Sequence, residues 1–198
     1  LTTRMDKWEK IIFVDDNIKS RAIDEVPVYT LEETLTGFEK AELEFIVAAG
    51  EPTSREFLYK KLEKHSLKYV NVVDPDFNLS KLSSIKNGTI VHTGATITVN
   101  VHVGTGCLIN KHSVIGHDVT VGDYTVISPN VSIGGDVNIG SKCYLGSGSI
   151  IRNGIKIGEN SIIGMGSVVL KDVEPNSIIA GNPAKFLRFN EDKKVFRK

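Results

Sequence analysis

The sequence has no excess of charge of either sign. Its 24 lysine and arginine residues are matched by 24 aspartate and glutamate residues, so the formal net charge at pH 7 is zero. A chain without a net positive field has no general attraction for nucleic acid or for an anionic membrane. We therefore expect neither as a partner.

Long apolar runs are also missing. No stretch approaches the roughly 20 apolar residues that a membrane-spanning helix needs, and no secretory signal peptide is visible. We expect a cytoplasmic protein without membrane insertion, with room in its 198 residues for one large or two small domains. Because the sequence begins at Leu1 and not at methionine, we also expect that a segment precedes it.

What the sequence does contain is an aliphatic residue at every sixth position. A period of six fits neither an α-helix nor a simple strand, and it is typical of a hexapeptide β-helix in which three hexads form one triangular coil. The fifteen positions are Ile85, Val91, Ile97, Val103, Ile109, Ile115, Val121, Ile127, Ile133, Ile139, Leu145, Ile151, Ile157, Ile163 and Val169.

A small or β-branched residue follows each aliphatic residue by four positions, from Thr89 to Val173, and glycine directly follows eight of the fifteen. We expect both the aliphatic and the small residues to point into the prism. Five coils would then stack so that each coil buries its neighbour.

Cysteine is scarce, and the repeat argues against a disulfide. Cys107 and Cys143 both occupy small inward positions and lie 36 residues apart, which is two coils. Stacked strands are about 4.8 Å apart, so the two Cα atoms would be separated by about 9–10 Å. Since a disulfide needs less than about 7 Å, we expect free, buried thiols, as in a cytoplasmic protein.

The first 75 residues carry no such repeat. Strands alternating with helices there imply a small parallel α/β layer. The expected elements are a strand at Ile11–Asp15, a short helix after a capping box at Thr30–Glu33, a strand at Leu43–Ala49, a helix capped by Thr53 or Ser54 and running to about His65 with Phe57, Leu58 and Leu62 at helical spacing, and a strand at Tyr69–Val73.

These patterns predict four segments. Residues 1–75 form an α/β domain, residues 76–84 a linker, residues 85–180 the β-helix, and residues 181–198 a cap and tail. The motif Gly181-Asn182-Pro183-Ala184-Lys185 ends the repeat, and we expect the basic residues Lys193, Lys194, Arg197 and Lys198 to be solvated.

Chemistry in a β-helix must lie on outward positions, because the inward ones are structural. His92, His102, His112 and His117 all occupy outward phases of the hexad. His117 follows a glycine and precedes Asp118, so a neutral imidazole is placed beside a carboxylate that can fix its tautomer. We expect His117 to act as a general base; the alternative is an exposed turn histidine with a solvated neighbour.

Stacking brings residues together that are 18 positions apart. Gly135 falls one coil after His117, where its missing side chain would leave a notch with bare backbone N–H groups, and Val99 falls one coil before. At the adjacent corner, Ser147 and Met165 follow each other and would line a groove for an extended pantetheine arm. The alternative is that glycine is simply frequent in this repeat and that Met165 makes a trimer contact.

The combination of these motifs resembles the bacterial nucleotide-sugar acyltransferases, such as the sialic acid O-acetyltransferases and UDP-4-amino-sugar N-acetyltransferases. The resemblance is carried by Gly116-His117-Asp118, Ile127-Ser128-Pro129, the unbroken hexads, the Gly-Asn-Pro-Ala-Lys ending and the segment Val14-Asp15-Asp16-Asn17. It implies a Rossmann-like N-terminal domain, here lacking its first strand, followed by a left-handed parallel β-helix in a homotrimer.

The resemblance also implies roles for individual residues. It implies that His117 is the catalytic base and Asp118 its acidic partner. Gly135, Ser147 and Met165 fall where the family contacts acetyl-CoA, and Asp15 and Asp16 match an acidic pair near the sugar nucleotide. The implied reaction is direct acetyl transfer in polysaccharide biosynthesis, to an amine or hydroxyl of a nucleotide-linked amino-sugar or sialic-acid-type sugar, with no metal.

Two departures from the family pattern keep alternatives open. Val126 stands where the family often has a second histidine, and the glycine-rich phosphate loop is absent. One alternative is a non-catalytic trimeric scaffold. Another is a zinc site like that of the prism-shaped carbonic anhydrases, using His112 and His117, although Asp76 stands where that family has its third histidine.

Overall fold

The computed structural model describes residues 8–17 and 20–196. The chain divides into two compact units, Leu1–Glu44 and Phe45–Lys198. None of the helices in the described residues combines the length and the apolar composition that crossing a membrane requires.

The hexapeptide repeat forms the expected prism, and each hexad contributes one two-residue strand that ends on its aliphatic residue. The strands are β5 (Ser84–Ile85), β6 (Ile90–Val91), β7 (Thr96–Ile97), β8 (His102–Val103), β9 (Leu108–Ile109), β10 (Val114–Ile115), β11 (Thr120–Val121), β12 (Val126–Ile127), β13 (Ser132–Ile133), β14 (Asn138–Ile139), β15 (Tyr144–Leu145), β16 (Ile150–Ile151), β17 (Lys156–Ile157), β18 (Ile162–Ile163) and β19 (Val168–Val169).

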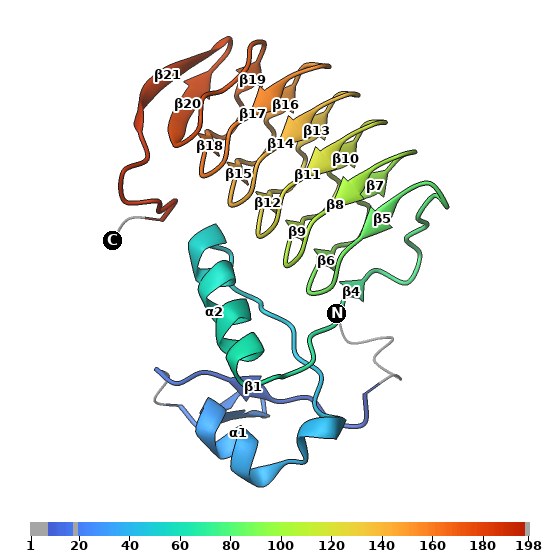
Figure 1. Cartoon of the computed structure of the whole chain (residues 1–198), viewed down its shortest axis with the longest axis vertical. Coiled ribbons are helices and arrows are strands. Elements are labelled where there is room, and N and C mark those ends of the chain that lie inside the picture. Colours follow the sequence, from blue (N-terminus) through green and yellow to red (C-terminus); the bar gives the residue numbers. More distant parts are fainter. Residues whose placement is uncertain (1–7, 18–19, 197–198) are drawn as a thin grey trace. The chain divides into compact units, whose positions relative to one another are not determined.

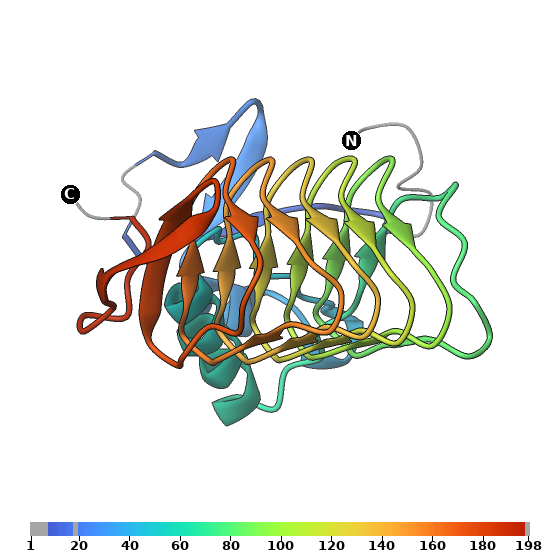
Figure 2. The same cartoon turned by 90° about the horizontal axis from the view of Figure 1, so that it is seen from above.

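Every third strand pairs in parallel, so the strands form the three faces of a left-handed β-helix. One face has the order β19-β16-β13-β10-β7 and another β17-β14-β11-β8-β5, while the third continues from β18 through β15, β12 and β9 to β6. Val114 pairs with Ser132 on one side and with Thr96 on the other, which confirms the register of 18 residues for each coil. Figure 2 shows these coils stacked side by side.

The prism is filled by the two inward positions of each hexad. All the aliphatic residues after Ile85 are buried, and so are the small residues, with Ala95 partly exposed at the first coil. Each fully buried Val, Leu or Ile stabilises the fold by roughly 1.5–3 kcal/mol relative to an exposed one. Stability therefore accumulates coil by coil.

Both cysteines are free and fully buried, as expected. Their thiols each donate a hydrogen bond to a backbone carbonyl of the following coil, Cys107 to Gly122 and Cys143 to Gly158, both at 3.2 Å. Burial raises the pKa of each thiol to about 12, so both stay protonated at neutral pH. The two side chains therefore fill space and carry no nucleophile.

Both ends of the prism are extended by strands outside the repeat. β4 (Val72–Val73) pairs in parallel with β6 at one end, and β20 (Ser177–Gly181) pairs with β18 at the other. β21 (Ala184–Phe189) then turns back antiparallel to β20, and the Asn182-Pro183 turn between them lies in the Gly-Asn-Pro-Ala-Lys motif.

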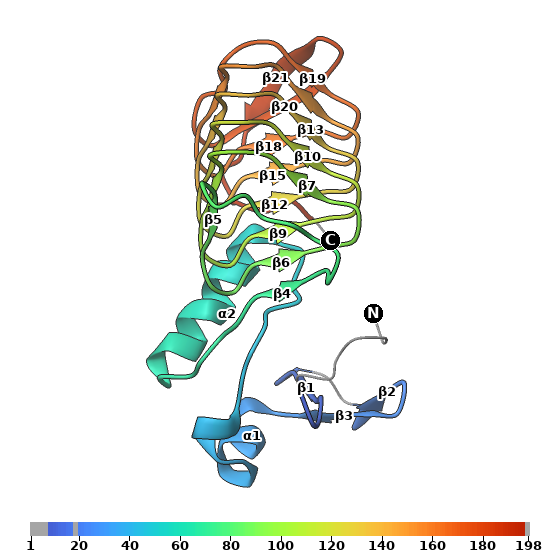
Figure 3. The same ribbon diagram turned by 90° about the vertical axis from the view of Figure 1, so that its right-hand side faces the viewer.

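Helix α2 (Pro52–Lys64) lies along one corner of the prism, within the same unit (Figure 3). The Arg55 guanidinium is buried and donates to the carbonyls of Gly106 at 2.6 Å and Cys107 at 3.2 Å, and also to those of Val47 and Ala49. Burial lowers the pKa of Arg55. These backbone carbonyls replace the carboxylate that a buried cation usually meets.

Tyr59 is the second anchor of α2. Its hydroxyl donates to the Gly88 carbonyl at 2.6 Å and accepts from the Val47 N–H at 3.2 Å, and its ring stacks on Tyr124 with centroids 6.0 Å apart. The buried face of the helix therefore includes Arg55 and Tyr59. The expected position Phe57 is 68% exposed.

The N-terminal unit is a small mixed sheet with one helix. β1 (Phe13–Val14) pairs in parallel with β3 (Val26–Tyr29), which pairs antiparallel with β2 (Ala22–Ile23). Helix α1 (Leu31–Gly37) starts at the predicted capping box of Thr30 and Glu33, and a short 3₁₀ helix, η1 (Lys40–Glu42), follows. The elements of both units are labelled in Figure 1.

Several expectations for residues 1–75 differ from the structure. The strand expected at Leu43–Ala49 is reduced to one bridge between Phe45 and Tyr69, and the strand expected at Tyr69–Val73 is β4, which pairs with the prism. The hairpin of β2 and β3 was not expected; its turn residues Asp24 and Glu25 have left-handed backbone conformations.

The division between the units lies at Glu44, whereas the sequence predicted a boundary between residues 75 and 85. The reason is that α2 and β4 pack on the prism through contacts that cannot be predicted from the hexapeptide repeat. Residues 76–84, expected as a linker, run from β4 to β5 inside the second unit.

The C-terminal tail is held by hydrogen bonds from its backbone and by one aromatic contact. The N–H groups of Val195 and Phe196 donate to the Glu51 carboxylate at 3.0–3.1 Å, and the Phe196 ring packs edge-on against Tyr144. Lys193 and Lys194 are exposed, as expected of a solvated tail. Arg197 and Lys198 lie outside the described residues.

Candidate active site

His117 lies on the corner between β10 and β11, and hydrogen bonds between coils fix this turn. The Gly116 N–H donates to Ile133, the Asp118 N–H donates to Val99, and the His117 carbonyl accepts from Asp136. Asp118 adopts a left-handed conformation, with φ of 59°. Asp tolerates this region better than most residues because its short side chain bonds locally.

Three side chains form a chain of hydrogen bonds on this corner. His117 Nδ1 lies 2.7 Å from Asp118 Oδ2, and the Asn100 amide donates to the other carboxylate oxygen, Oδ1, at 2.6 Å. The His117 side chain is 58% exposed and the Asp118 side chain is 50% exposed. A molecule in solution can therefore reach the ring.

The charge state of Asp118 sets the tautomer of His117. The Asn100 amide, followed by the His117 imidazole, lowers the pKa of Asp118. An ionised carboxylate accepts hydrogen bonds and donates none, so Nδ1 must carry the proton. The lone pair of the neutral ring is then on Nε2, the nitrogen that is free to accept a proton from a substrate.

Gly135 lies directly against the imidazole, one coil further along the prism. A Cβ atom at this position would be 2.5 Å from both Nε2 and Cε1 of His117. The Gly135 backbone conformation is not left-handed, so the requirement is for space. Among the hydrogen bonds of the described residues, none uses the Gly135 N–H.

Ser147 and Met165 lie on the preceding corner of the prism. The Ser147 carbonyl accepts from the Gly166 N–H at 2.9 Å, which places the Met165–Gly166 turn one coil above the Ser147–Gly148 turn. Side chains built at Gly148 and Gly166 would meet nothing within 4 Å, and Met165 is 78% exposed. No hydrogen bond in the described residues connects this corner with His117.

The other prism histidines lie apart from this arrangement. His102 meets Ser84 Oγ at 2.9 Å, and burial, with the charge of Lys111, lowers the pKa of His92. His112 packs against Gly94 on the same corner column as Gly148. Within the described part of the chain, no three His, Cys, Asp or Glu side chains are grouped so that they could hold a metal ion.

Asp15 and Asp16 lie in the N-terminal unit, where each carboxylate accepts a hydrogen bond from a backbone N–H group. Asp15 Oδ1 accepts from the Asn17 N–H, and Asp16 Oδ1 accepts from the Leu31 N–H at the start of α1, both at 2.8 Å. At least one oxygen of each carboxylate thus has a backbone partner. Their role at a sugar nucleotide stays a prediction.

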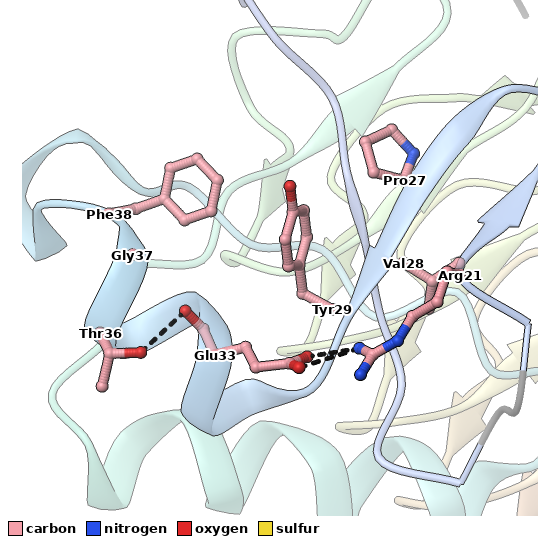
Figure 4. A pocket seen from close by; sticks show the side chains of 8 residues that line it. All are labelled: Arg21, Pro27, Val28, Tyr29, Glu33, Thr36, Gly37 and Phe38. Carbon is pink, nitrogen blue, oxygen red and sulfur yellow. Dashed lines mark hydrogen bonds and ion pairs between the residues drawn. The ribbon is translucent and has the colours of Figure 1, made fainter.

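The same unit contains an open cavity of about 570 Å³ (Figure 4). Arg21 and Glu33 form an ion pair at 2.9 Å on one side, and the rings of Tyr29 and Phe38 meet edge-on, with centroids 5.7 Å apart, on the other. Neither Asp15 nor Asp16 is among its lining residues.

Val126, which replaces a histidine of the family pattern, is 2% exposed. It precedes the inward Ile127 on β12 and therefore points away from the core, between Leu108 of β9 and Tyr144 of β15. A valine here is therefore a packing residue.

Sequence reasoning missed Asn100. It lies 18 positions before Asp118, so the column rule that places Gly135 beside His117 also places Asn100 beside Asp118. The spacing of 18 residues was therefore visible in the sequence, but it was used only to find the neighbours of His117. Arg55 and Tyr59 were missed too, because a buried arginine has no periodic signature.

Comparison with known proteins supports the interpretation of the repeat. The model for bacterial transferase hexapeptides (six repeats) matches residues 100–135 and 136–171. No curated protein matches the chain significantly.

Several solved structures share the fold over most of the chain. A perosamine N-acetyltransferase variant from Caulobacter crescentus, solved with CoA and GDP-perosamine, is 28% identical, with a TM-score of 0.81 over 85% of this chain and 81% of that one. The acetyltransferase domain of PglB from Neisseria gonorrhoeae FA1090, in complex with acetyl coenzyme A, is 25% identical, with a TM-score of 0.84 over 90% and 87%. WeeI from Acinetobacter baumannii AYE is 25% identical, with a TM-score of 0.78 over 89% and 85%.

The repeat, the prism and the neighbouring structures agree. The chain is an acyltransferase that carries bacterial transferase hexapeptide repeats, and it is similar in structure to a perosamine N-acetyltransferase and to the acetyltransferase domain of PglB.

Proposed function

We propose that the protein transfers an acetyl group from acetyl-CoA to an amine or hydroxyl of a nucleotide-linked sugar, with His117 as the general base. The observation that carries the proposal is the orientation of the imidazole. Asp118 Oδ2 lies 2.7 Å from Nδ1, and the Nε2 edge of the ring lies over Gly135, in the space that a Cβ atom there would occupy. CoA, acetyl-CoA and GDP-perosamine in the structures of the neighbours support these substrates.

In the proposed reaction, the acceptor attacks the thioester carbonyl while His117 Nε2 takes its proton. A C–N or C–O bond forms and the C–S bond breaks. The imidazolium then returns the proton to the CoA sulfur, so no acyl-enzyme is needed. The unpaired Gly135 N–H is suited to stabilise the oxyanion that develops. Bringing both reactants together in one complex contributes further.

We propose that acetyl-CoA binds next to the corner of Ser147 and Met165, in a homotrimer whose sites lie between neighbouring prisms. The face of β7, β10, β13, β16 and β19 separates this corner from that of His117. Val114 and Ile150 point outward on that face and are exposed, so a second prism could bury them. A second prism covering this face would bring the two corners of different chains together.

The acceptor is proposed to be a nucleotide sugar that meets Asp15 and Asp16 of the N-terminal unit. The free thiols and the need for acetyl-CoA are consistent with a cytoplasmic location.

Sedimentation analysis tests the proposed homotrimer directly. The proposal requires a particle with three times the mass of one chain.

The reaction is tested by release of free thiol from acetyl-CoA with a panel of acceptors, including UDP-4-amino-sugars, GDP-perosamine and a sialic acid. We expect His117→Ala to lower kcat by about 10²–10⁴-fold. The matched control is His102→Ala, an exposed histidine on β8 whose ring meets Ser84 Oγ and makes no hydrogen bond with His117 or Asp118 in the described residues. It should keep wild-type turnover.

Each outcome bears on a different part of the proposal. Full turnover by His117→Ala would reject His117 as the base. Binding of acetyl-CoA without thiol release from any acceptor would point to another sugar or acyl donor. No binding of acetyl-CoA, measured by calorimetry, would favour the non-catalytic scaffold.

A further inference from the structure

Asn100 has a contact that the proposed mechanism does not yet use. We propose that Asn100 is a positioning residue, which holds Asp118 in the orientation that fixes the tautomer of His117. The inference rests on the proposed function of His117. It assigns to Asn100 an effect on the reaction without contact with the substrate.

The geometry gives each carboxylate oxygen of Asp118 its own partner. Asn100 Nδ2 donates to Oδ1 at 2.6 Å, and Oδ2 meets His117 Nδ1 at 2.7 Å. The terminal torsion of an aspartate is soft, so an exposed carboxylate rotates freely unless something holds it. With Oδ1 held by Asn100, Oδ2 stays directed at the imidazole.

Stacking of the coils fixes both ends of this contact. Asn100 and Asp118 occupy the same column of one corner, and both have left-handed backbones, with φ of 56° and 59°. The Asp118 N–H donates to the Val99 carbonyl, which ties the two turns together next to the side-chain contact. The amide and the carboxylate are therefore aligned by the prism itself.

The electrostatic effect has the sign that the mechanism needs. The two groups that act on Asp118 are the Asn100 amide, which lowers its pKa most, and the His117 imidazole. A carboxylate that stays ionised accepts a hydrogen bond from Nδ1–H, so the lone pair of the ring stays on Nε2. Loss of the Asn100 amide removes the largest single cause of the lowered pKa of Asp118.

A simpler role for Asn100 has to be separated from this one. Asparagine is favoured at left-handed positions, and Asn130 and Asn176 occupy such positions elsewhere in the prism. Glycine adopts the same backbone without strain. Asn100→Gly therefore removes the amide and keeps the turn, whereas a turn-forming role would leave this variant fully active.

The experiment compares Asn100→Gly and Asn100→Asp with the control Asn176→Gly. Asn176 has φ of 57°, and its side chain makes no hydrogen bond in the described residues. Two quantities are measured in the full chain: kcat for acetyl transfer, and the tautomer ratio of His117 from the ¹⁵N shifts of the imidazole. The second needs neither acetyl-CoA nor an acceptor.

We expect Asn100→Gly to lower kcat by about tenfold, the effect of one hydrogen bond to a charged group, with KM unchanged. The Nε2–H tautomer should rise in parallel. Asn100→Asp should lower kcat further, because two carboxylates then face each other. Asn176→Gly should keep the wild-type kcat and tautomer ratio.

The proposal is overturned if Asn100→Gly keeps the wild-type kcat and tautomer ratio, or if kcat falls without a change of tautomer. Asn100→Asp, which keeps the size of the side chain, provides the same readings if Asn100→Gly fails to fold. If the wild type transfers acetyl to no acceptor but the tautomer still shifts in Asn100→Gly, the positioning role stands and the proposed function fails.

Discussion

At the scale of the residue, the candidate site depends on the absence of a side chain at Gly135. The imidazole of His117 occupies the space that a Cβ atom on Gly135 would need, with Nε2 and Cε1 nearest to that position. Asn100 and Asp118 then hold the other nitrogen of the ring. One glycine and two polar side chains, each one coil from its partner, thus define how the base is presented.

Gly135→Ala tests this arrangement. A methyl group 2.5 Å from Nε2 and Cε1 forces the ring to move. Because the Gly135 backbone suits any residue, we expect the loss to fall on activity, with kcat lowered at least tenfold and the melting temperature changed by a few degrees at most. In the control Gly50→Ala the nearest atom is 4.0 Å away, so kcat should not change. An alanine variant with wild-type kcat would show that the ring does not need this space.

At the scale of the element, α2 is a helix of the second unit that lies outside the repeat. It packs on a corner of the prism through Arg55 and Tyr59, both fully buried, which use side-chain donors to satisfy backbone carbonyls of turns. Apolar residues of the helix such as Phe57 stay exposed. The helix is therefore attached by hydrogen bonds at defined positions as well as by an apolar face.

Tyr59→Phe should lower the free energy of unfolding by about 1–3 kcal/mol, because it leaves the Gly88 carbonyl and the Val47 N–H buried without their partner. Denaturant unfolding measures the difference. Phe57→Ala, on the exposed side of the same helix, should change stability by no more than about 0.5 kcal/mol. Equal stability of Tyr59→Phe and the wild type would mean that the two backbone groups find other partners.

At the scale of the whole molecule, stability is a sum over stacked coils. Each coil buries its aliphatic and small residues against the coils before and after it, and it has few other contacts. A defect in a central coil therefore interrupts the stack at both of its faces, whereas a change on an outward position is felt locally.

Ile133→Asp should prevent folding of the prism. Ile133 is 2% exposed and lies on β13, between β10 and β16 in the middle of the stack, so the variant buries a carboxylate with no partner. Circular dichroism should show loss of the cooperative thermal transition. Asn138→Asp, an outward and exposed position on β14, is the control and should fold normally. A folded Ile133→Asp variant would contradict the assignment of this position to the core.

The predicted site was accessible from the sequence to the extent that the prism is periodic. Because each coil has 18 residues, positions 117 and 135 are predicted to be neighbours, and the structure places Gly135 against His117. The same rule applied to Asp118 would have found Asn100. What the rule does not contain is side-chain orientation, which decides that the Asn100 amide meets one carboxylate oxygen and the imidazole the other.

By itself, the sequence determined the hexad repeat, the inward positions, the three-faced prism and the two free thiols, because a repeat of short strands has only one register that buries every aliphatic residue. Only the tertiary structure decided that α2 and β4 belong with the prism, that Arg55 is buried and that Leu43–Ala49 forms no strand. The physical reason is that these segments are held by a few hydrogen bonds to distant parts of the chain, and such contacts leave no period in the sequence.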